Sequence, residues 1–361
     1  MRHFIKYIFS TILDCLFNLR FLFPVKQCNV NRIGVLFLKN LGFGDILMLS
    51  PIVHYLKIIY PNARIYIVSE WEKLFEFDNT VWVKPNEFDE NFDMLISPTS
   101  NFRHYIWILR GNMITGYFGS GKLLRNFSNG NHKYFINHNE HYIRRLLPIF
   151  NVISVVGYKR LLSDLEKGRI VYPNLISAQY HNVSLKNMNY ASIHLCNDDY
   201  DREWNYDMVI HLIHEFSNGY GVDSFFILGT KSIIDLKLTN YIHERLVKLG
   251  INCEIINDVT LPQLTHIITN SILFIGMDNG PSHIALLQNV KSWIFYVSMD
   301  PGYRRPYKNC SRVVTFYPDP KPISPLFNGL RKPSMREVKN RREMMSLENA
   351  LDSIHKNFPK V

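Results

Sequence analysis

Residues 272–307 constrain the fold of this chain more than any other stretch. An apolar run at 272–275 precedes turn-forming residues at 276–281. Apolar residues then recur at helical spacing over 282–288, and a second apolar run follows at 293–297. This succession predicts a strand, a tight loop, a helix and a second strand parallel to the first, which is the repeating unit of a parallel α/β sheet.

The loop of this stretch is a candidate ligand site. In open α/β sheets ligands bind at the carboxyl ends of the strands, where this loop is expected to lie. Glycine lets a backbone approach a ligand closely, proline suits the first helical turn, and the positive end of the helix favours a diphosphate. A second interpretation stays open, in which Asp278 or Ser282 simply caps the helix. The loop consists of Asp278, Asn279, Gly280, Pro281, Ser282 and His283.

The same alternation runs through the rest of the chain and predicts two doubly wound parallel sheets. A chain of 361 residues is long enough for two domains, each with its own core. Pro51 is expected to kink the helix that contains it. Strands are predicted at 32–38, 64–68, 80–83, 94–96, 113–116, 190–195, 224–228 and 253–256, and helices at 46–60, 101–109, 141–150, 207–216, 233–249 and 340–358.

Composition limits the partners and the compartment. The hydrophobic content of 47% excludes a disordered chain, and the formal net charge of +10 indicates an anionic partner. Five cysteines without Cys-x-x-Cys spacing indicate neither a zinc site nor a disulfide framework, which favours a reducing cytoplasm. No recognised nucleic-acid-binding module appears, so we expect no nucleic-acid partner.

Residues 1–25 form a segment with a pattern of its own. Lys6, Asp14 and Arg20 interrupt its apolar runs, which argues against a signal peptide or a membrane span. The apolar residues share one helical face, so we expect an amphipathic helix that ends at Pro24. Two interpretations stay open: this helix lies in an anionic membrane surface, or it packs on the protein itself.

Asp45 is the carboxylate with the strongest case for a catalytic role. It follows the carboxyl end of the first predicted strand. There its carboxylate can accept the proton of a substrate hydroxyl. The alternative is that Asp45 caps the following helix. Gly42 and Gly44 precede it, but the third glycine of a dinucleotide fingerprint is missing, which argues against a dehydrogenase.

Three motifs together resemble the family 9 glycosyltransferases, the ADP-heptose:lipopolysaccharide heptosyltransferases. Residues 278–285 (DNGPSHIA) resemble the family's D-[ST]-G-x-x-H-[LI]-A, with Asn279 in place of Ser or Thr. Residues 41–47 (LGFGDIL), followed by Pro51, resemble its opening motif. Arg202, two residues before a tryptophan, stands where the family has a Lys or Arg. The resemblance extends over residues 32–358.

The resemblance implies a GT-B fold, in which two Rossmann-like doubly wound domains face a cleft. The expected divisions are an amphipathic extension at 1–29, an acceptor-binding domain at 30–165, a linker at 166–188, a nucleotide-sugar-binding domain at 189–335, and a C-terminal helix at 336–361 that packs back toward the first domain. It also implies a metal-independent inverting transferase without a cofactor. Asp45 is then the general base, while Arg202 and the 282–288 helix stabilise the leaving diphosphate.

The implied donor is ADP-heptose and the implied acceptor a lipopolysaccharide core, reached in the cytoplasm at the inner face of the bacterial inner membrane. His283 either contacts phosphate or orders the loop. The basic, aromatic-rich stretch 119–141 either grips an anionic saccharide or is a solvated loop. The expected donor-binding residues are Lys231, Asp278, Asn279, Gly280, Pro281, Ser282 and His283, and the expected acceptor-binding residues are Gly44, Lys122, Arg125, Lys133, Arg144 and Arg145.

Three alternatives to this function remain. A transferase of the same family with another sugar nucleotide would share these motifs. A sugar-nucleotide 2-epimerase of the same fold would need further acid and base groups. The third is a non-enzyme, a basic nucleic-acid-binding protein, against which the lack of a recognised module argues. Asp199 and Asp201 are a candidate metal site within a transferase, although the family works without a required metal.

Overall fold

The computed structural model describes residues 29–38, 42–87, 91–101, 111–118, 124–125, 133–134, 141–180, 189–195, 206–296, 305, 313–316 and 347–357. The chain divides into two compact units, Met1–Asn174 and Leu175–Val361. The predicted N-terminal helix lies outside the described residues, as does nearly all of the helix predicted at 101–109.

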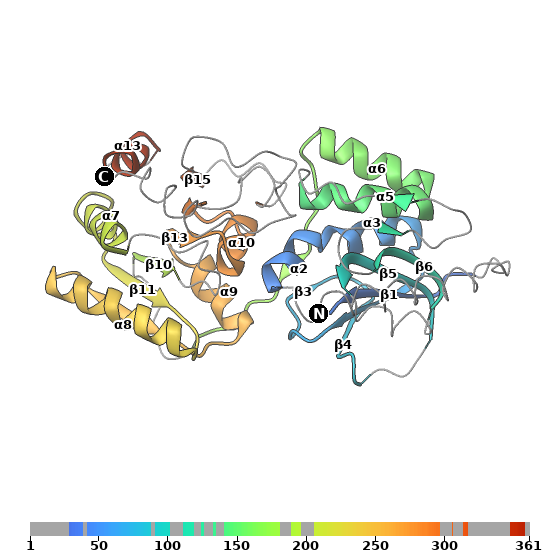
Figure 1. Ribbon diagram of the computed structural model, residues 1–361, viewed down its shortest axis with the longest axis horizontal. Helices are drawn as coiled ribbons and strands as arrows, with labels where there is room; N and C mark the ends of the chain where they lie inside the picture. Colours follow the sequence, from blue (N-terminus) through green and yellow to red (C-terminus); the bar gives the residue numbers. More distant parts are fainter. Residues whose placement is uncertain are drawn as a thin grey trace, which may run out of the picture. The chain divides into compact units, whose positions relative to one another are not determined.

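The first unit is built on a five-stranded sheet with the order β4-β2-β1-β5-β6, in which all neighbours are parallel (Figure 1). The strands are β1 (Arg32–Phe37), β2 (Arg64–Ser69), β4 (Thr80–Val83), β5 (Phe92–Asn101) and β6 (Gly111–Phe118). Two short pairs accompany them: β3 (Phe75–Glu76) with β9 (Asn174–Leu175), and β7 (Leu124–Arg125) with β8 (Lys133–Tyr134). The helices are α2 (Phe43–Leu49), α3 (Pro51–Ile59), the 3-10 turn η2 (Tyr142–Arg145), α5 (Leu146–Ile153) and α6 (Val155–Glu166).

Pro51 divides the predicted helix 46–60 into α2 and α3. A proline has no N–H to donate to the preceding turn, so the helical ladder is interrupted there. Ser50 closes α2, because its N–H and its Oγ both donate to the carbonyl of Leu47, at 3.3 and 2.7 Å. The kink expected from the sequence is therefore a full break between two helices.

Helix α6 was missed by the sequence analysis. Ser154 caps it by accepting from the N–H of Gly157 at 3.2 Å. Leu161 and Leu165 are buried, so α6 adds to the core of the first unit. In Figure 1 it lies with α3 and α5 on one side of the sheet.

The second unit has a six-stranded, wholly parallel sheet with the order β12-β11-β10-β13-β14-β15 (Figure 1). Its strands are β10 (Tyr190–His194), β11 (Ser224–Leu228), β12 (Cys253–Ile256), β13 (Leu273–Met277), β14 (Ser292–Phe295) and β15 (Val313–Phe316). Its helices are α7 (Tyr206–Gly219), α8 (Ile233–Lys248), α9 (Leu261–Thr269), α10 (Gly280–Leu287) and α13 (Leu347–Asn357). The sheet has one strand, β15, that was not predicted.

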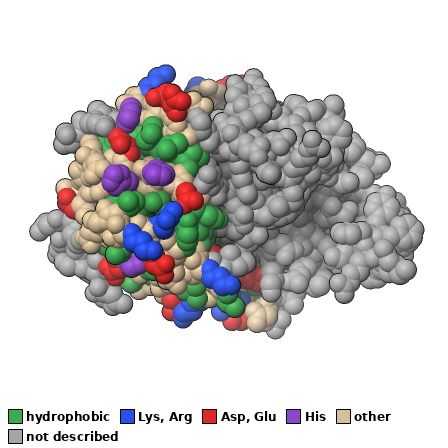
Figure 2. Space-filling model, turned by 60° about the vertical axis from the view of Figure 1, so that its left-hand side comes forward, with side chains coloured by type: hydrophobic (Ala, Val, Ile, Leu, Met, Phe, Trp, Pro, Cys, Tyr) green, Lys and Arg blue, Asp and Glu red, His purple; other side chains and the backbone are tan. Residues whose placement is uncertain are grey.

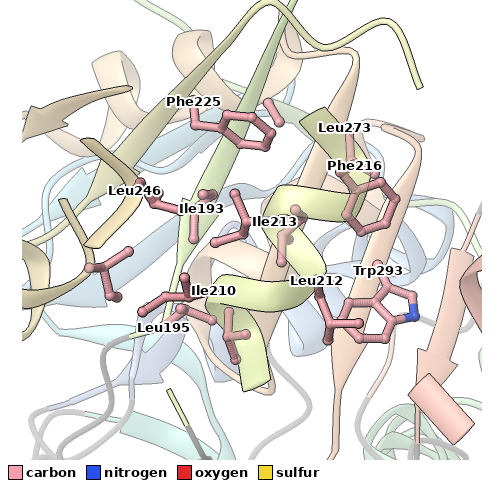
Figure 3. Close-up of a cluster of buried hydrophobic side chains, with 14 of the residues drawn as sticks. Ile193, Leu195, Ile210, Leu212, Ile213, Phe216, Phe225, Leu246, Leu273 and Trp293 are labelled. Atoms are coloured by element: carbon pink, nitrogen blue, oxygen red, sulfur yellow. The ribbon is translucent and has the colours of Figure 1, made fainter. Parts of the chain in front are cut away.

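The core of this unit lies between α7 and the sheet. Figure 3 shows Ile213 and Phe216 of α7 among side chains from the strands, including Trp293 of β14. The rings of Phe216 and Trp293 are 6.2 Å apart between centroids, at an edge-to-face angle of 64°. Because apolar residues recur along one face of α7, burial of that face fixes the helix on the sheet.

Each sheet has a reversal point, the place at which successive strands stop being added on one side of the first strand and begin to be added on the other. From β10 the chain proceeds to β11 and β12 on one side, then returns to β13, β14 and β15 on the other. In the first unit β1 has the same place, between β2 and β5. In doubly wound sheets ligands bind at this reversal, outside the carboxyl ends of the strands. The predicted doubly wound α/β fold is confirmed, and it directs attention to the segments that follow β1, β10 and β13.

Candidate functional site

The loop after β13 is held by a reciprocal cap at the start of α10. The side chain of Asn279 accepts from the N–H of Ser282, and the N–H of Asn279 donates to Oγ of Ser282, both at 3.3 Å. Oγ of Ser282 also donates to the carbonyl of Asn279 at 2.7 Å. The N-cap is therefore Asn279 and not Asp278, while Ser282 takes part in the cap as its reciprocal partner in the first helical turn.

Capping changes what the helix end offers to an anion. Pro281 has no N–H, and the N–H of Ser282 donates to Asn279. The remaining attraction for a diphosphate comes from the helix dipole.

Asp278 and His283 lie side by side at this helix end. Nε2 of His283 is 4.0 Å from Oδ1 of Asp278, and both side chains are buried. The N–H of Asp278 donates to the carbonyl of Phe295 at 3.1 Å, which ties the loop to β14. His283 thus packs against the loop, as expected if it orders Asp278; whether it also contacts phosphate stays a prediction.

His194 is a member of this site that the sequence analysis missed. It is the last residue of β10, and its Nδ1 lies 2.8 Å from Nδ2 of Asn279 on the loop after β13. Burial lowers the pKa of His194 to about 4, although the nearby Asp235 carboxylate acts in the opposite direction. In the sequence it stands inside an apolar run, which predicts only a strand.

The loop after β11 carries Lys231. This lysine forms an ion pair with Asp258, with 2.5 Å between Nζ and Oδ2, and both side chains are largely exposed. The loop itself is fixed by the buried carboxylate of Asp235, which accepts from the N–H of Thr230 at 3.1 Å. Ser232 caps α8 by accepting from the N–H of Asp235 at 3.1 Å. Lys231 therefore stands at the carboxyl end of a strand with its charge accessible to solvent.

Asp45 lies within the first turn of α2 and is half-buried. The N-cap of this helix is Gly42, which has no side chain to cap with, and the N–H of Asp45 donates to the carbonyl of Gly42 at 3.0 Å. The interpretation of Asp45 as the helix cap is therefore wrong. Gly44, next to it, is buried in the same turn.

The expected acceptor-binding residues are described only in part. Arg125 of β7 and Lys133 of β8 are directly opposite each other in the antiparallel pair. Arg144 and Arg145 share the turn η2, and Arg144 is half-buried. The remaining predicted side chains lie outside the described residues: Lys122 of the acceptor group, Arg202 of the catalytic group, and the candidate metal ligands Asp199 and Asp201.

The described surface of the second unit carries charges of both signs. In the face shown in Figure 2, basic, acidic and histidine side chains are interspersed with apolar ones. On this face the net positive charge of the chain does not gather into one basic patch. Within the part of the chain that the structure describes, no helix has the length and apolar character needed to cross a membrane.

Comparisons by sequence identify no relative, since neither a protein-family model nor a curated protein matches the chain. Comparison of the structure finds a glycosyl transferase of family 9 from Veillonella parvula, with a TM-score of 0.64 and 14% identity over 93% of this chain and 99% of that one. The fold is that of the family 9 glycosyltransferases. The GT-B fold class expected from the sequence is therefore confirmed.

Two heptosyltransferases of E. coli share this GT-B fold. ADP-heptose lipopolysaccharide heptosyltransferase II matches with a TM-score of 0.58 and 13% identity, over 91% of this chain and 98% of that one. Heptosyltransferase WaaC with ADP matches with a TM-score of 0.56 and 13% identity, over 90% and 99%. The likeness spans nearly the whole length of each protein, so both units belong to the shared fold.

Proposed function

We propose that this chain is an inverting glycosyltransferase that transfers heptose from ADP-heptose to a lipopolysaccharide core. The observation that carries the proposal is the loop from Asp278 to His283, which stands at the reversal point of the second sheet and begins α10. Doubly wound sheets bind their ligands at this place. The likeness of fold to a family 9 glycosyl transferase and to two heptosyltransferases supports the same proposal.

The second unit binds the nucleotide sugar in this proposal. Asp278 accepts hydrogen bonds from donor hydroxyls, while Asn279, Gly280, Pro281 and Ser282 form the helix end that faces the diphosphate. Lys231 exchanges its ion pair with Asp258 for phosphate oxygens, which is inexpensive because exposed ion pairs contribute little stability. The E. coli heptosyltransferase WaaC was solved with ADP and with ADP-2-deoxy-2-fluoro heptose, which supports an adenosine diphosphate sugar as the donor.

The reaction is a single in-line displacement. The Asp45 carboxylate takes the proton of the acceptor hydroxyl, and that oxygen attacks the anomeric carbon of the donor. The bond from this carbon to the diphosphate oxygen breaks, and its electron pair leaves with ADP. Arg202 and the positive end of α10 offset the charge that develops on the leaving group. Because attack is from the side opposite the leaving group, the anomeric configuration inverts.

The first unit binds the acceptor. Its basic residues Arg125, Lys133, Arg144 and Arg145, together with Lys122, attract the phosphates and carboxylates of a lipopolysaccharide core. Gly44 is assigned to this acceptor site because it lies next to Asp45 in the first turn of α2. Residues 1–25 hold the protein at the anionic inner face of the membrane, where this acceptor is presented.

Transfer and donor binding are tested separately. The Asp45→Ala variant should lose turnover while its affinity for ADP stays within about twofold of the wild-type value, because the substitution removes the base and leaves the donor site intact. The Lys231→Ala variant should lose ADP affinity instead. A panel of ADP-, UDP- and GDP-sugars then identifies the donor. An Asp45→Ala variant with unchanged turnover would contradict the assignment of the base.

A further inference from the structure

The side-chain amide of Asn279 has both of its ends engaged. Its Oδ1 accepts from the N–H of Ser282 at 3.3 Å, as the N-cap of α10 requires. The Nδ2 group therefore points the other way, and there it meets Nδ1 of His194 at 2.8 Å. The cap fixes which end of the amide is oxygen, so the hydrogen bond between Asn279 and His194 has a defined direction.

This direction fixes the state of the histidine. Since Nδ2 of Asn279 donates, Nδ1 of His194 must accept, and an imidazole can accept only at a nitrogen that carries no proton. His194 is therefore neutral with its proton on Nε2. Burial of the ring at the end of β10 favours this neutral state, because burial disfavours the charged form, and it outweighs the Asp235 carboxylate and a hydrogen bond to the backbone of His194 itself, which act in the opposite direction.

The hydrogen bond joins the two strands that flank the reversal point. Strands β10 and β13 are adjacent in the sheet, and His194 is paired in register with Gly276. At Gly276 a Cβ atom would meet the carbonyl oxygen of His194 at 3.2 Å and the Phe274 ring at 2.5 Å, which shows how closely the strands pack here. The hydrogen bond between His194 and Asn279 thus links the end of β10 to the loop after β13, and it forms only when this loop is ordered.

We infer that His194 is a positioning residue for the donor loop, which holds the Asn279 side chain, and through it the first turn of α10, in the orientation that receives the donor diphosphate. The inference rests on the proposed function for the identity of the ligand. It concerns a residue that does not itself contact the donor. The contact also explains why position 279 is an asparagine. A Ser or Thr there would cap the helix with its hydroxyl, but its shorter side chain would not also reach His194.

The first test observes His194 directly and needs no ligand. The chain contains 14 histidines, and the signal of His194 in a long-range ¹H–¹⁵N spectrum is identified by its loss in His194→Asn. At pH 7 the spectrum should show Nδ1 unprotonated and Nε2 protonated. In Asn279→Asp the capping oxygen is kept but the donor becomes an acceptor, so the ring should move its proton to Nδ1 or become charged. A protonated Nδ1 in the wild-type protein would overturn the inference.

The second test is a double-substitution cycle on ADP affinity, measured by calorimetry. His194→Leu removes the acceptor and should weaken ADP binding about three- to tenfold, the effect of one neutral hydrogen bond. His194→Asn places an oxygen near the former Nδ1 and should restore most of that loss. In the Asn279→Thr background, where the hydrogen bond is absent, His194→Leu should cost little more. His211→Leu, an exposed histidine of α7, is the matched control and should bind as the wild type does.

The two tests separate the possible failures. If the wild-type chain binds no ADP while Nδ1 of His194 accepts from Asn279, the proposed function is contradicted, and with it the role of the contact in donor binding. If ADP binds but the two substitutions act independently, the proposed function stands and the inference is overturned.

Discussion

The hydroxyl of Tyr55 on α3 donates a hydrogen bond to Oδ2 of Asp164 on α6, over 3.1 Å, and both side chains are buried. Nε of Arg160 donates to the same oxygen at 3.0 Å. The contact attaches α6 to the helix that follows the break at Pro51. Burial, and secondarily the Asp164 carboxylate, raise the pKa of Tyr55, so the hydroxyl stays protonated and can donate at any physiological pH.

Removal of this hydroxyl should destabilise the first unit. In Tyr55→Phe the buried carboxylate loses one of its two donors, and we expect the free energy of unfolding to fall by about 1–2 kcal/mol in urea denaturation. Tyr158→Phe, on a half-buried tyrosine of α6, should have an effect below about 0.5 kcal/mol. Equal effects of the two substitutions would show that the contact adds nothing to stability.

Gly276 should not tolerate a side chain. In Gly276→Ala the new Cβ would lie 2.5 Å from Cε1 of Phe274, which is too close for two carbon atoms, so the ring must move. Overpacking of this kind costs about 1–3 kcal/mol, measured as a lower denaturation midpoint. Phe274→Leu in the same chain relieves the clash, so the double variant should lose less than the sum of the single ones. Strict additivity would contradict this account.

Acidification should destabilise the second unit through His194. Folding lowers the pKa of His194 from 6.5 to about 4. Between these two values the imidazole binds a proton in the unfolded chain but not in the folded one. Stability is therefore unaffected above about pH 6.5 and falls as the pH drops toward 4, by about 3 kcal/mol at most. The neighbouring Asp235 carboxylate reduces this loss. His194→Asn cannot titrate, so the difference in unfolding free energy between wild type and variant should change across this range. A constant difference from pH 7 to pH 4 would refute the buried neutral histidine.

Asp278 should matter for the donor rather than for the fold. Asp278→Asn keeps the shape of the side chain but removes the charge beside His283, and we expect ADP-heptose affinity to fall about ten- to hundredfold, as for hydrogen bonds to a charged group. Asp223→Asn, at an exposed carboxylate just before β11 in the same unit, should weaken binding no more than about twofold. If the two variants bound the donor equally well, Asp278 would have no part in its recognition.

Strand bounds, the helix break and the loop after β13 could be predicted from the sequence, because local residue patterns determine them. Strands such as β11 and β12 begin and end where their apolar runs do, and Pro51 interrupts its helix as a missing N–H requires. The loop after β13 was found because a strand, a glycine, a proline and a helix succeed one another in a fixed order. Its cap was assigned to Asp278 or Ser282, although asparagine is an equally good N-cap, so local chemistry did not choose among the three.

The rest depends on contacts between distant segments. His194 is separated from Asn279 by 85 positions, so only the order of strands in the sheet brings them together. Helix α6 was missed because charged and polar residues separate its apolar positions, and its buried face is defined by α3. The four residues of strand β15 stand in the sequence between basic and proline-rich residues, and only their pairing with β14 identifies them as a strand. Tertiary contact overrides weak local preference in each of these cases.

The most direct test of the proposed function is the mass of the acceptor after incubation. Truncated lipopolysaccharide core is mixed with the purified full-length protein and ADP-heptose, with Asp45→Ala as the matched control. The account predicts a mass increase of one heptose and release of ADP with the wild-type protein, and no increase with the variant. An unchanged acceptor with every nucleotide sugar of the panel, from a protein that is folded and binds ADP, would contradict the assignment as a glycosyltransferase acting on this core.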